Sequence, residues 1–475
     1  MARQPSISYS ITVRLEVPAR GNAVSQLTHA VEEAGGVVTA LDVTASGTER
    51  LRIDVTCAAS DTDHAQQLTE ALSRVEGVSI GKVSDRTFLM HLGGKIEIQP
   101  KMPIRNRDDL SMIYTPGVAR VCLALAENPD DARRLTIKRN TVAVVTDGSA
   151  VLGLGNLGAV PALPVMEGKA ALFKRFAGID AFPICLDTQD VDEIVRAVEL
   201  IAPVFAGINL EDISAPRCFE VERRLREKLD IPVFHDDQHG TAIVVLAALL
   251  NALKVVDKRL EDVRIVMSGA GAAGMAILAV LLQAGAQHVV VADKDGVIHP
   301  DREGLGPELA SVAERTNREG LTGRLTDALK GADVFIGVSA PNLLTGEDIA
   351  TMADGSIVFA MANPVPEVDP MAAAEHAAVV ATGRSDFANQ INNVLAFPGV
   401  FRGLLDAHSH SITIDMLIAA ARALAAVVSE EELHASYIVP SVFHPEVAHT
   451  VAAAVSAAVK AEGASVLPDE QQPAV

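Results

Sequence analysis

The feature that most constrains the fold is a regular alternation, from about residue 100 onward, of short apolar runs with segments of helical spacing. Strands covered by helices on both faces are continuously apolar, and such alternation is typical of a parallel sheet. The alanine-rich stretch 416–465 predicts closing helices, and 467–475 predicts a disordered tail. We therefore expect an α/β architecture with strands near 141–147, 181–187, 203–212, 231–237, 263–271, 288–293, 332–339 and 356–364.

Residues 8–85 show a different pattern, in which alternating strands and amphipathic helices follow in the order β-α-β-β-α-β. This is the order of a small ferredoxin-like domain. The pattern resembles ACT regulatory domains, which bind small metabolites or pair with themselves; a purely structural dimerisation module is the alternative. We expect four regions: an ACT-like domain (1–88), an α/β catalytic domain (89–238), a Rossmann-type NAD(P) domain (239–400), and C-terminal helices with the tail (401–475).

The composition argues against nucleic acid and membranes as partners. The 475 residues carry a formal net charge of −21, which repels phosphate backbones and anionic lipids. Tryptophan is absent and tyrosine occurs three times, so stacking platforms for single-stranded nucleic acid are not expected. The apolar segment 241–256 is too short to span a bilayer comfortably and predicts a buried core helix. Four widely spaced cysteines and an N-terminus without a signal-peptide core favour a cytoplasmic protein.

The pattern GxGxxG occurs twice, at 153–158 and at 269–274, and only the surroundings distinguish the two copies. A dinucleotide loop needs a preceding strand, a helix that begins at the glycines, and an acid about 20 residues further on for the ribose hydroxyls. The second copy meets all three conditions, and its acid is Asp293. The first copy is followed by prolines and predicts substrate-side architecture or a plain turn. The expected pyrophosphate-binding residues are Gly269, Ala270, Gly271, Ala272, Ala273 and Gly274.

The identity of the dinucleotide depends on Asp293. A carboxylate at this position repels a 2′-phosphate and therefore favours NAD, whereas the neighbouring Lys294 would offset part of that repulsion. We expect NAD as the cofactor, with NADP as the alternative.

Two pairs of adjacent acids follow successive apolar runs, Glu211 and Asp212 in "INLEDI" and Asp236 and Asp237 in "FHDDQHGTA". Neighbouring parallel strands bring their carboxyl ends to the same edge of a sheet, so the two pairs are expected to meet. Crowded carboxylates need a compensating cation, and oxygen ligands suit Mg²⁺ or Mn²⁺. The sequence therefore predicts a divalent-cation site here, with the nearby histidines in structural roles.

A tyrosine and a lysine are candidates for proton transfer. Tyr114 precedes Pro116 and Gly117 in "YTPGVAR", a rigid turn that would present a phenol as a proton donor. Lys169 lies in the apolar segment "MEGKAALF", where burial would lower its pKa and make it a base. Lys174, on the same predicted helix, fits an ordinary solvent-exposed charge.

Together, "YTPGVA", "TDGSAVLGLGNLG", "MEGKAALF", "INLEDI", "FHDDQHGTA", "GAGAAG", "MANPVPE" and "NQINNVLAFPGVFRG" resemble the motifs of malic enzymes of the short bacterial type. The resemblance covers about residues 90–460. It implies oxidative decarboxylation of L-malate to pyruvate and CO2, with NAD or NADP and with Mg²⁺ or Mn²⁺, in a protein that forms a homodimer.

The same resemblance assigns roles to residues. Tyr114 matches the general acid and Lys169 the general base; Asp236 matches the acid that contacts this lysine. Asn363 and Asn393 match asparagines that contact malate and the nicotinamide region. Larger malic enzymes carry an arginine for a malate carboxylate where this chain has Ala150, so that cation stays unassigned. The three expected metal ligands are Glu211, Asp212 and Asp237.

Three other functions remain open from the sequence. Malolactic enzyme is a related activity that yields lactate without net NADH. A metal-free 2-hydroxyacid dehydrogenase would not need the two carboxylate pairs. From a different class, the chain could be a metabolite sensor that binds an effector at the ACT-like domain and whose catalytic half is inert.

Overall fold

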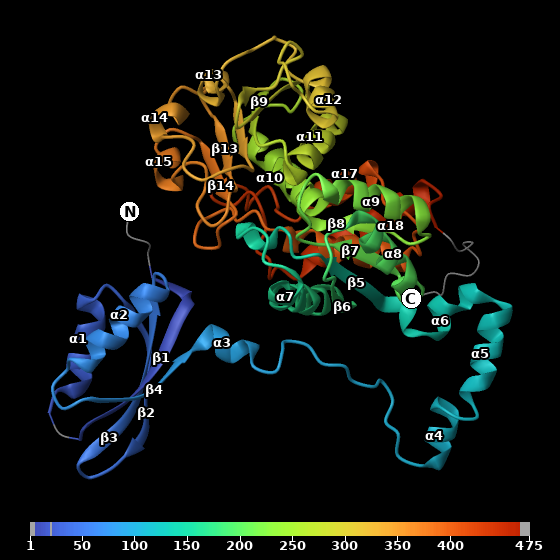
Figure 1. Ribbon diagram of the computed structural model, residues 1–475. Coiled ribbons are helices and arrows are strands. Elements are labelled where there is room, and N and C mark those ends of the chain that lie inside the picture. Colours follow the sequence, from blue (N-terminus) through green and yellow to red (C-terminus); the bar gives the residue numbers. More distant parts are fainter. Residues whose placement is uncertain (1–4, 20, 466–475) are drawn as a thin grey trace. The chain divides into compact units, whose positions relative to one another are not determined.

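The computed structural model describes residues 5–19 and 21–465, and the predicted tail at 467–475 lies outside the described residues. The chain divides into two compact units, Met1–Gln99 and Pro100–Val475, each described here by itself (Figure 1).

The N-terminal unit has the predicted β-α-β-β-α-β order. Its sheet has the strand order β2-β3-β1-β4 with antiparallel neighbours, and Leu15, Val55 and Leu68 lie in the core between the sheet and the helices. A short helix, α3, completes the unit. The elements are β1 (Ser6–Pro18), α1 (Ala23–Glu33), β2 (Val37–Ser46), β3 (Arg50–Ala59), α2 (Thr62–Ser73), β4 (Ser79–Asp85) and α3 (Arg86–His91).

Two helices of the larger unit, α4 (Arg107–Ile113) and α5 (Val118–Glu127), contain no buried residue. Apolar side chains on and beside them are exposed: Leu110, Met112, Ile113, Val121 and Leu123. The short segments α6 (Ala132–Leu135) and the 3-10 turns Pro129–Asp131 and Ile137–Asn140 connect them to the first strand of the catalytic sheet.

The first sheet of this unit is parallel, as predicted, with the order β6-β5-β7-β8. Two expected strands are shorter than the apolar runs that predicted them, because 203–212 begins with a 3-10 turn at Ala202–Val204 and 231–237 ends in a π turn at Asp236–Gly240. Helices α7, α8 and α9 connect the strands. The bounds are β5 (Thr141–Thr146), α7 (Ala159–Ala177), β6 (Asp180–Cys185), α8 (Val191–Ile201), β7 (Gly207–Leu210), α9 (Arg217–Lys228) and β8 (Val233–His235).

The second sheet has the order β11-β10-β9-β12-β13-β14 and is parallel except for the short edge strand β11. The strands β11 and β14 were not predicted from the sequence. Its elements are β9 (Arg264–Ser268), α11 (Ala272–Ala284), β10 (His288–Asp293), β11 (Gly296–Val297), α12 (Pro307–Arg315), α13 (Leu325–Leu329), β12 (Val334–Gly337), α14 (Gly346–Ile349), β13 (Ile357–Ala360), α15 (Pro370–Ala374) and β14 (Val379–Thr382).

The two sheets share one hydrophobic core, in which α10 (Thr241–Val255) is central. By length and composition the segment Asp236–Val255 could cross a membrane, but 72% of its apolar window is buried inside the protein, as in a core helix. The predicted core helix at 241–256 is thus confirmed. The closing helices α16 (Phe397–Asp406), α17 (Ile414–Ala426) and α18 (Glu446–Ala461) pack into the same core.

Candidate active site

The two acid pairs meet at one edge of the first sheet, as the strand pattern predicts. Glu211 and Asp212 directly follow β7, Asp236 and Asp237 directly follow β8, and these strands are neighbours. After β8 the chain makes a single π turn before α10; π turns often occur at functional sites. Gly240 allows this turn, because a Cβ there would collide with the Asp236 carboxylate.

Three of these acids have the geometry of a cation site. One carboxylate oxygen from each of Glu211, Asp212 and Asp237 lies within 4.8 Å of the others. The backbone of Asp212 is in the left-handed region (φ 54°), and its N–H donates to Asp237 Oδ2 over 2.9 Å. Asp212 Oδ2 is buried and has no hydrogen-bond partner in the described part of the chain. A buried, unpaired carboxylate oxygen that faces two other acids fits a divalent cation.

The pKa values of the acids reflect the same crowding. Burial, and then the negative charge of Asp237, raise the pKa of Asp212 to about 7. Burial also raises the pKa of Glu211 well above its usual range; the Lys169 ammonium opposes this effect, and the surrounding aspartates add to it. A bound cation would stabilise the ionised forms of both acids.

Lys169, on α7, is buried beside this cluster. Its Nζ lies 2.6 Å from Asp236 Oδ2 and 2.9 Å from Glu211 Oε1, and 4.1 Å from the centre of the Phe397 ring. The sequence predicted a lowered pKa, and this is wrong: burial does lower the pKa of Lys169, but the Asp236 and Glu211 carboxylates outweigh it and the pKa is raised. Lys174, by contrast, is exposed and pairs with Asp180, as an ordinary surface charge does.

Asn393 connects Asp236 to the C-terminal part of the chain. Its Nδ2 donates to Asp236 Oδ2 over 3.1 Å, and its Oδ1 accepts from the Thr241 hydroxyl over 3.1 Å. The carboxylate of Asp236 therefore has Lys169 and Asn393 as partners, which fix its orientation.

The second glycine loop has the expected strand–loop–helix geometry. Gly269 follows β9 with a φ of 110°, and α11 begins at Ala272. A Cβ at Gly274 would collide with the Gly269 carbonyl oxygen, whereas a Cβ at Gly271 would meet open space. Gly274 thus closes the turn and Gly271 leaves the approach to the helix N-terminus open, where a pyrophosphate binds in such folds.

Asp293 ends β10, where the acid was predicted, and it has a partner that the sequence did not reveal. Arg302 Nη2 donates to Asp293 Oδ2 over 2.7 Å and lies 3.5 Å from Asp295 Oδ2. Lys294, which was expected to offset the charge of Asp293, instead lies 3.7 Å from Asp295 and is largely exposed. Arg302 lies in a loop nine positions after Asp293, and nothing in the sequence pattern predicts that the two side chains pair.

The first glycine loop lies opposite the second sheet. A Cβ at Gly153 would come within 3.1 Å of the Asn363 carbonyl oxygen, and one at Gly383 within 2.9 Å of Asn363 Nδ2. Asn363 is therefore at the junction of the two sheets, on the loop that follows β13. The prediction that the first copy belongs to the substrate side fits this placement.

The structure does not bring Tyr114 to this cluster. Its side chain is 64% exposed at the end of α4 and makes no hydrogen bond to another described residue, whereas Lys169 is buried. Tyr114 is thus separate from the other predicted proton-transfer residue within one chain.

Of the two histidines in the π-turn region, His239 has a structural partner, whereas both ring nitrogens of the buried His235 have no hydrogen-bond partner in the described part of the chain. His239 Nε2 lies 2.7 Å from Glu222 Oε1, and Glu222 also pairs with Arg226. Burial opposes ionisation of Glu222, but His239 and Arg226 outweigh it and lower its pKa to about 2. Glu222 was not predicted as a site residue, because it lies in the charged sequence of α9.

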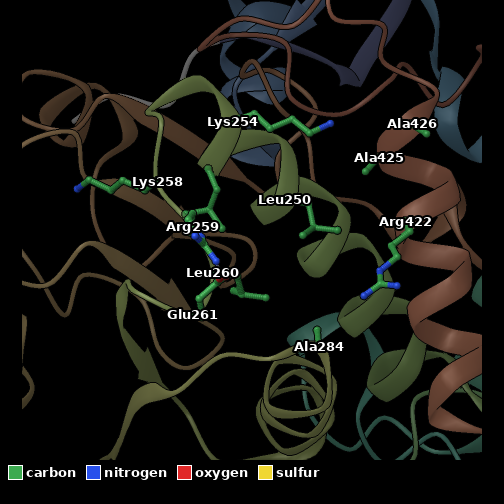
Figure 2. Close-up of a pocket in the computed structure, with 11 residues that line it drawn as sticks. Leu250, Lys254, Lys258, Arg259, Leu260, Glu261, Ala284, Arg422, Ala425 and Ala426 are labelled. Carbon is green, nitrogen blue, oxygen red and sulfur yellow. Dashed lines mark hydrogen bonds and ion pairs between the residues drawn. The ribbon is translucent and has the colours of Figure 1, made fainter.

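A separate pocket of about 510 Å³ lies at the other end of α10 (Figure 2). Leu250 and Lys254 of α10, Arg259 of the following loop, and Arg422 of α17 line it. The acids begin α10 and this pocket lies beside its last turns, so the pocket is distinct from the acid cluster.

The second sheet with its glycine loop is a Rossmann-type dinucleotide domain, and the first sheet presents the acids and the lysine beside it. These features define a two-domain, dinucleotide-dependent oxidoreductase of the α/β class. Family models for the malic enzyme N-terminal domain and the malic enzyme NAD-binding domain match residues 93–226 and 238–460. The chain belongs to the malic enzyme family.

Individual relatives agree with this assignment. The NAD-dependent malic enzyme of Geobacillus stearothermophilus is 56% identical over 96% of this chain and 95% of its own length. That coverage is too large to leave out the N-terminal unit. The bifunctional malic/malolactic enzyme of Bacillus subtilis is 53% identical over 78% of this chain and 91% of its own. The crystal structure of the NAD-dependent malic enzyme from Thermotoga maritima matches with a TM-score of 0.76 and 48% identity, covering 78% of this chain and 99% of that chain.

Proposed function

We propose that this chain catalyses the oxidative decarboxylation of L-malate to pyruvate and CO2 with reduction of NAD. The observation that carries the proposal is the position of Lys169 between Asp236 and Glu211, one of the three clustered acids, in a protein with a Rossmann-type dinucleotide domain. The 56% identity to an NAD-dependent malic enzyme supports the same reaction.

Glu211, Asp212 and Asp237 are the residues that would hold Mg²⁺ or Mn²⁺. When bound, such an ion supplies Lewis acidity to the oxygen atoms of a hydroxy acid and to the enolate that decarboxylation leaves. Neutralising Glu211 in this way would also remove one of the two charges that raise the pKa of Lys169, which favours the neutral amine.

Lys169 acts as the general base in this proposal. Its Nζ accepts the proton of the C2 hydroxyl while a hydride leaves C2 for the nicotinamide, which converts malate to the keto acid. Asp236 holds the amine in place and is itself held by Asn393. Asn363 is the proposed contact to malate and the nicotinamide. Loss of CO2 then leaves an enolate whose C3 must receive a proton.

Tyr114 is the proposed donor of that proton, and we infer that a second copy of the chain completes the site. Tyr114 lies between two helices without buried residues, and short helices of this kind gain their stability from packing against a partner. Their exposed apolar side chains fit a homodimer interface. In the proposed dimer, α4, α5 and Tyr114 of one chain lie near Lys169 and the clustered acids of the other chain.

One assay tests the main proposal. Malate-dependent formation of NADH or NADPH is followed by the absorbance of the reduced nicotinamide, with Mn²⁺ and with EDTA. We expect metal-dependent NADH formation with weaker use of NADP. Turnover that persists unchanged in EDTA would instead support a metal-free dehydrogenase. A protein that binds a small-molecule effector but does not turn over malate would support the metabolite sensor.

Malolactic activity is a second candidate because of the similarity to the bifunctional Bacillus subtilis enzyme. Product analysis separates the two: pyruvate with stoichiometric NADH supports the malic reaction, and lactate without net NADH supports the malolactic one.

We also propose that the N-terminal unit is an ACT-like regulatory domain that takes a small-molecule effector. Its β-α-β-β-α-β order and its separate core support this proposal. A protein without residues 1–88 keeps the whole segment that matches the malic enzyme N-terminal domain, so it should keep malate turnover and lose its response to small metabolites. A truncated protein that no longer forms dimers would instead indicate a structural dimerisation module.

A further inference from the structure

A buried carboxylate links the ends of two strands of the dinucleotide domain. Glu367 has no exposed surface. It accepts from the Ser339 N–H, which follows β12, over 2.8 Å, and from the Ala362 N–H, which follows β13, over 3.0 Å. Each oxygen therefore holds one strand end. Both ends lie on the edge of the sheet at which open α/β sheets bind ligands.

The link extends to the glycine loop. The Ser339 hydroxyl lies 2.8 Å from the hydroxyl of Ser268, the last residue of β9, and 3.4 Å from Glu367 Oε1. Ser268 directly precedes Gly269. Glu367 thus connects three consecutive strand ends of the sheet through one carboxylate and one hydroxyl pair.

The surroundings of Glu367 are shaped for a carboxylate. A Cβ at Gly337 would approach the Glu367 carboxyl carbon to 2.5 Å, so glycine at that position leaves room for the group. Among the described residues, burial and hydrogen bonds from Ala362 and Ser339 affect the ionisation of Glu367, and no cationic side chain does. Burial raises the pKa of Glu367, and the N–H groups of Ala362 and Ser339 oppose the rise.

A buried acid without a cation is a poor way to stabilise a fold, because a well-packed apolar side chain does so at lower cost. A carboxylate, unlike an apolar group, can accept hydrogen bonds from two backbone N–H groups at once. The loop that carries Ala362 continues to Asn363, which lies against the Gly153 loop of the first sheet. Glu367 therefore fixes the backbone where the two sheets face each other.

We propose that Glu367 is a positioning residue for the nicotinamide half of the dinucleotide. It holds the loops after β12 and β13 so that Asn363 and the backbone beside it meet the nicotinamide, while the glycine loop binds the pyrophosphate. The proposal rests on the proposed function, since that function requires the nicotinamide at the junction of the sheets.

The test compares ligands with and without the nicotinamide. The full-length protein, free of metal, is titrated with NADH, followed by its fluorescence, and with ADP-ribose, followed by calorimetry. In Glu367→Gln, one amide oxygen and one NH2 replace two acceptors, so one loop loses its partner. We expect the Kd for NADH to rise about tenfold, with that for ADP-ribose changed less than about twofold. Glu347→Gln, an exposed glutamate on α14, is the control that should change neither.

The proposal would be overturned if the Kd values for NADH and ADP-ribose rose by the same factor, or if the Kd for NADH did not rise. If Glu367→Gln does not fold, Glu367→Asp decides: its shorter side chain keeps the charge but cannot reach both the Ser339 and the Ala362 N–H, so the Kd for NADH should rise about threefold and that for ADP-ribose should change less than about twofold. An unchanged Kd for NADH in Glu367→Asp then rejects the role. Malate turnover in the unaltered protein tests the proposed function separately. Failure of the proposed function can therefore be told apart from failure of the role proposed for Glu367.

Discussion

Lys169 Nζ lies 2.6 Å from Asp236 Oδ2, and both side chains are buried. The pair joins α7 to the π turn that follows β8, and so it connects the proposed base to the chain segment that also carries Asp237. A charge-assisted hydrogen bond of this length fixes the amine, and the pairing makes the protonation state of Lys169 depend on its acidic neighbours.

Replacing this lysine should remove the base while keeping the charge. Arginine does not lose its proton in proteins, so Lys169→Arg should lower kcat by about 10²–10⁴. Steady-state kinetics with malate and NAD measure the loss, and NADH binding checks that the dinucleotide domain is intact. Lys174→Arg, on the same helix but exposed, should leave kcat unchanged. Near-normal turnover in Lys169→Arg would exclude it as the base.

Metal binding should depend on pH near neutrality. The pKa of Asp212 is raised to about 7 by burial and Asp237. The ion binds the deprotonated acid, so affinity is complete above this pKa and falls as pH drops below it, by about tenfold per unit for one displaced proton. Electron paramagnetic resonance of free Mn²⁺ between pH 6 and 8 measures this. Asp212→Asn should bind Mn²⁺ weakly and with a shallower pH dependence, because Glu211, whose pKa is also raised, still titrates. An unchanged slope in that variant would contradict the assignment.

Complementation between variants tests whether two chains share a site. Tyr114→Phe and Lys169→Arg homodimers should each be nearly inactive. After mixing with subunit exchange, half of the dimers are mixed and each holds one intact site, so about one quarter of the unaltered activity should return. If no activity returns although mixed dimers form, each site uses the tyrosine and lysine of one chain.

The two glycines of the dinucleotide loop should respond differently to alanine. Gly274→Ala places a Cβ against the Gly269 carbonyl and should lower the midpoint of thermal unfolding. Gly271→Ala adds a methyl group to open space, so the fold should stay and the KM for NAD should rise about tenfold as the pyrophosphate approach narrows. Equal thermal stability of both variants would contradict the close packing at Gly274.

Asp293 should set the preference between dinucleotides. Asp293→Ser removes the negative charge and leaves Arg302 without its main partner, free to meet a 2′-phosphate. The ratio of kcat/KM for NADP to that for NAD should rise about tenfold, or about 1.4 kcal/mol. Asp295→Ser is the control: it removes the 3.5 Å contact to Arg302 and the 3.7 Å contact to the exposed Lys294 but leaves Arg302 paired with Asp293, so it should change the ratio little.

The sequence predicted the sheets and the meeting of the acids because both follow from periodicity. Apolar runs mark buried parallel strands, and the ends of neighbouring strands converge, so the pairs Glu211–Asp212 and Asp236–Asp237 could be grouped from the sequence. The choice of Asp237 over Asp236 as a metal ligand came from the resemblance to malic enzymes. The π turn at Asp236–Gly240 and the positive φ of Asp212 could not, since they depend on tertiary packing.

Pairings between distant segments were missed for the same reason. Arg302 with Asp293 and Glu367 with the strand-end amides join residues whose sequence neighbourhoods carry no periodic signal. The pKa of Lys169 was predicted in the wrong direction, because the apolar helix suggested burial alone and the facing carboxylates come from other elements.

The shared core has a consequence for how the site can move. Because 11 of the 15 residues of α10 are buried and the helix begins after the π turn that carries Asp236 and Asp237, local opening of that region would expose much of the core of both sheets. Such openings have free energies close to that of global unfolding. Amide hydrogens of α10 should therefore exchange with solvent among the slowest in the chain. The acid cluster should therefore stay in place during turnover. Any closure over the substrate has to come from elements outside this core.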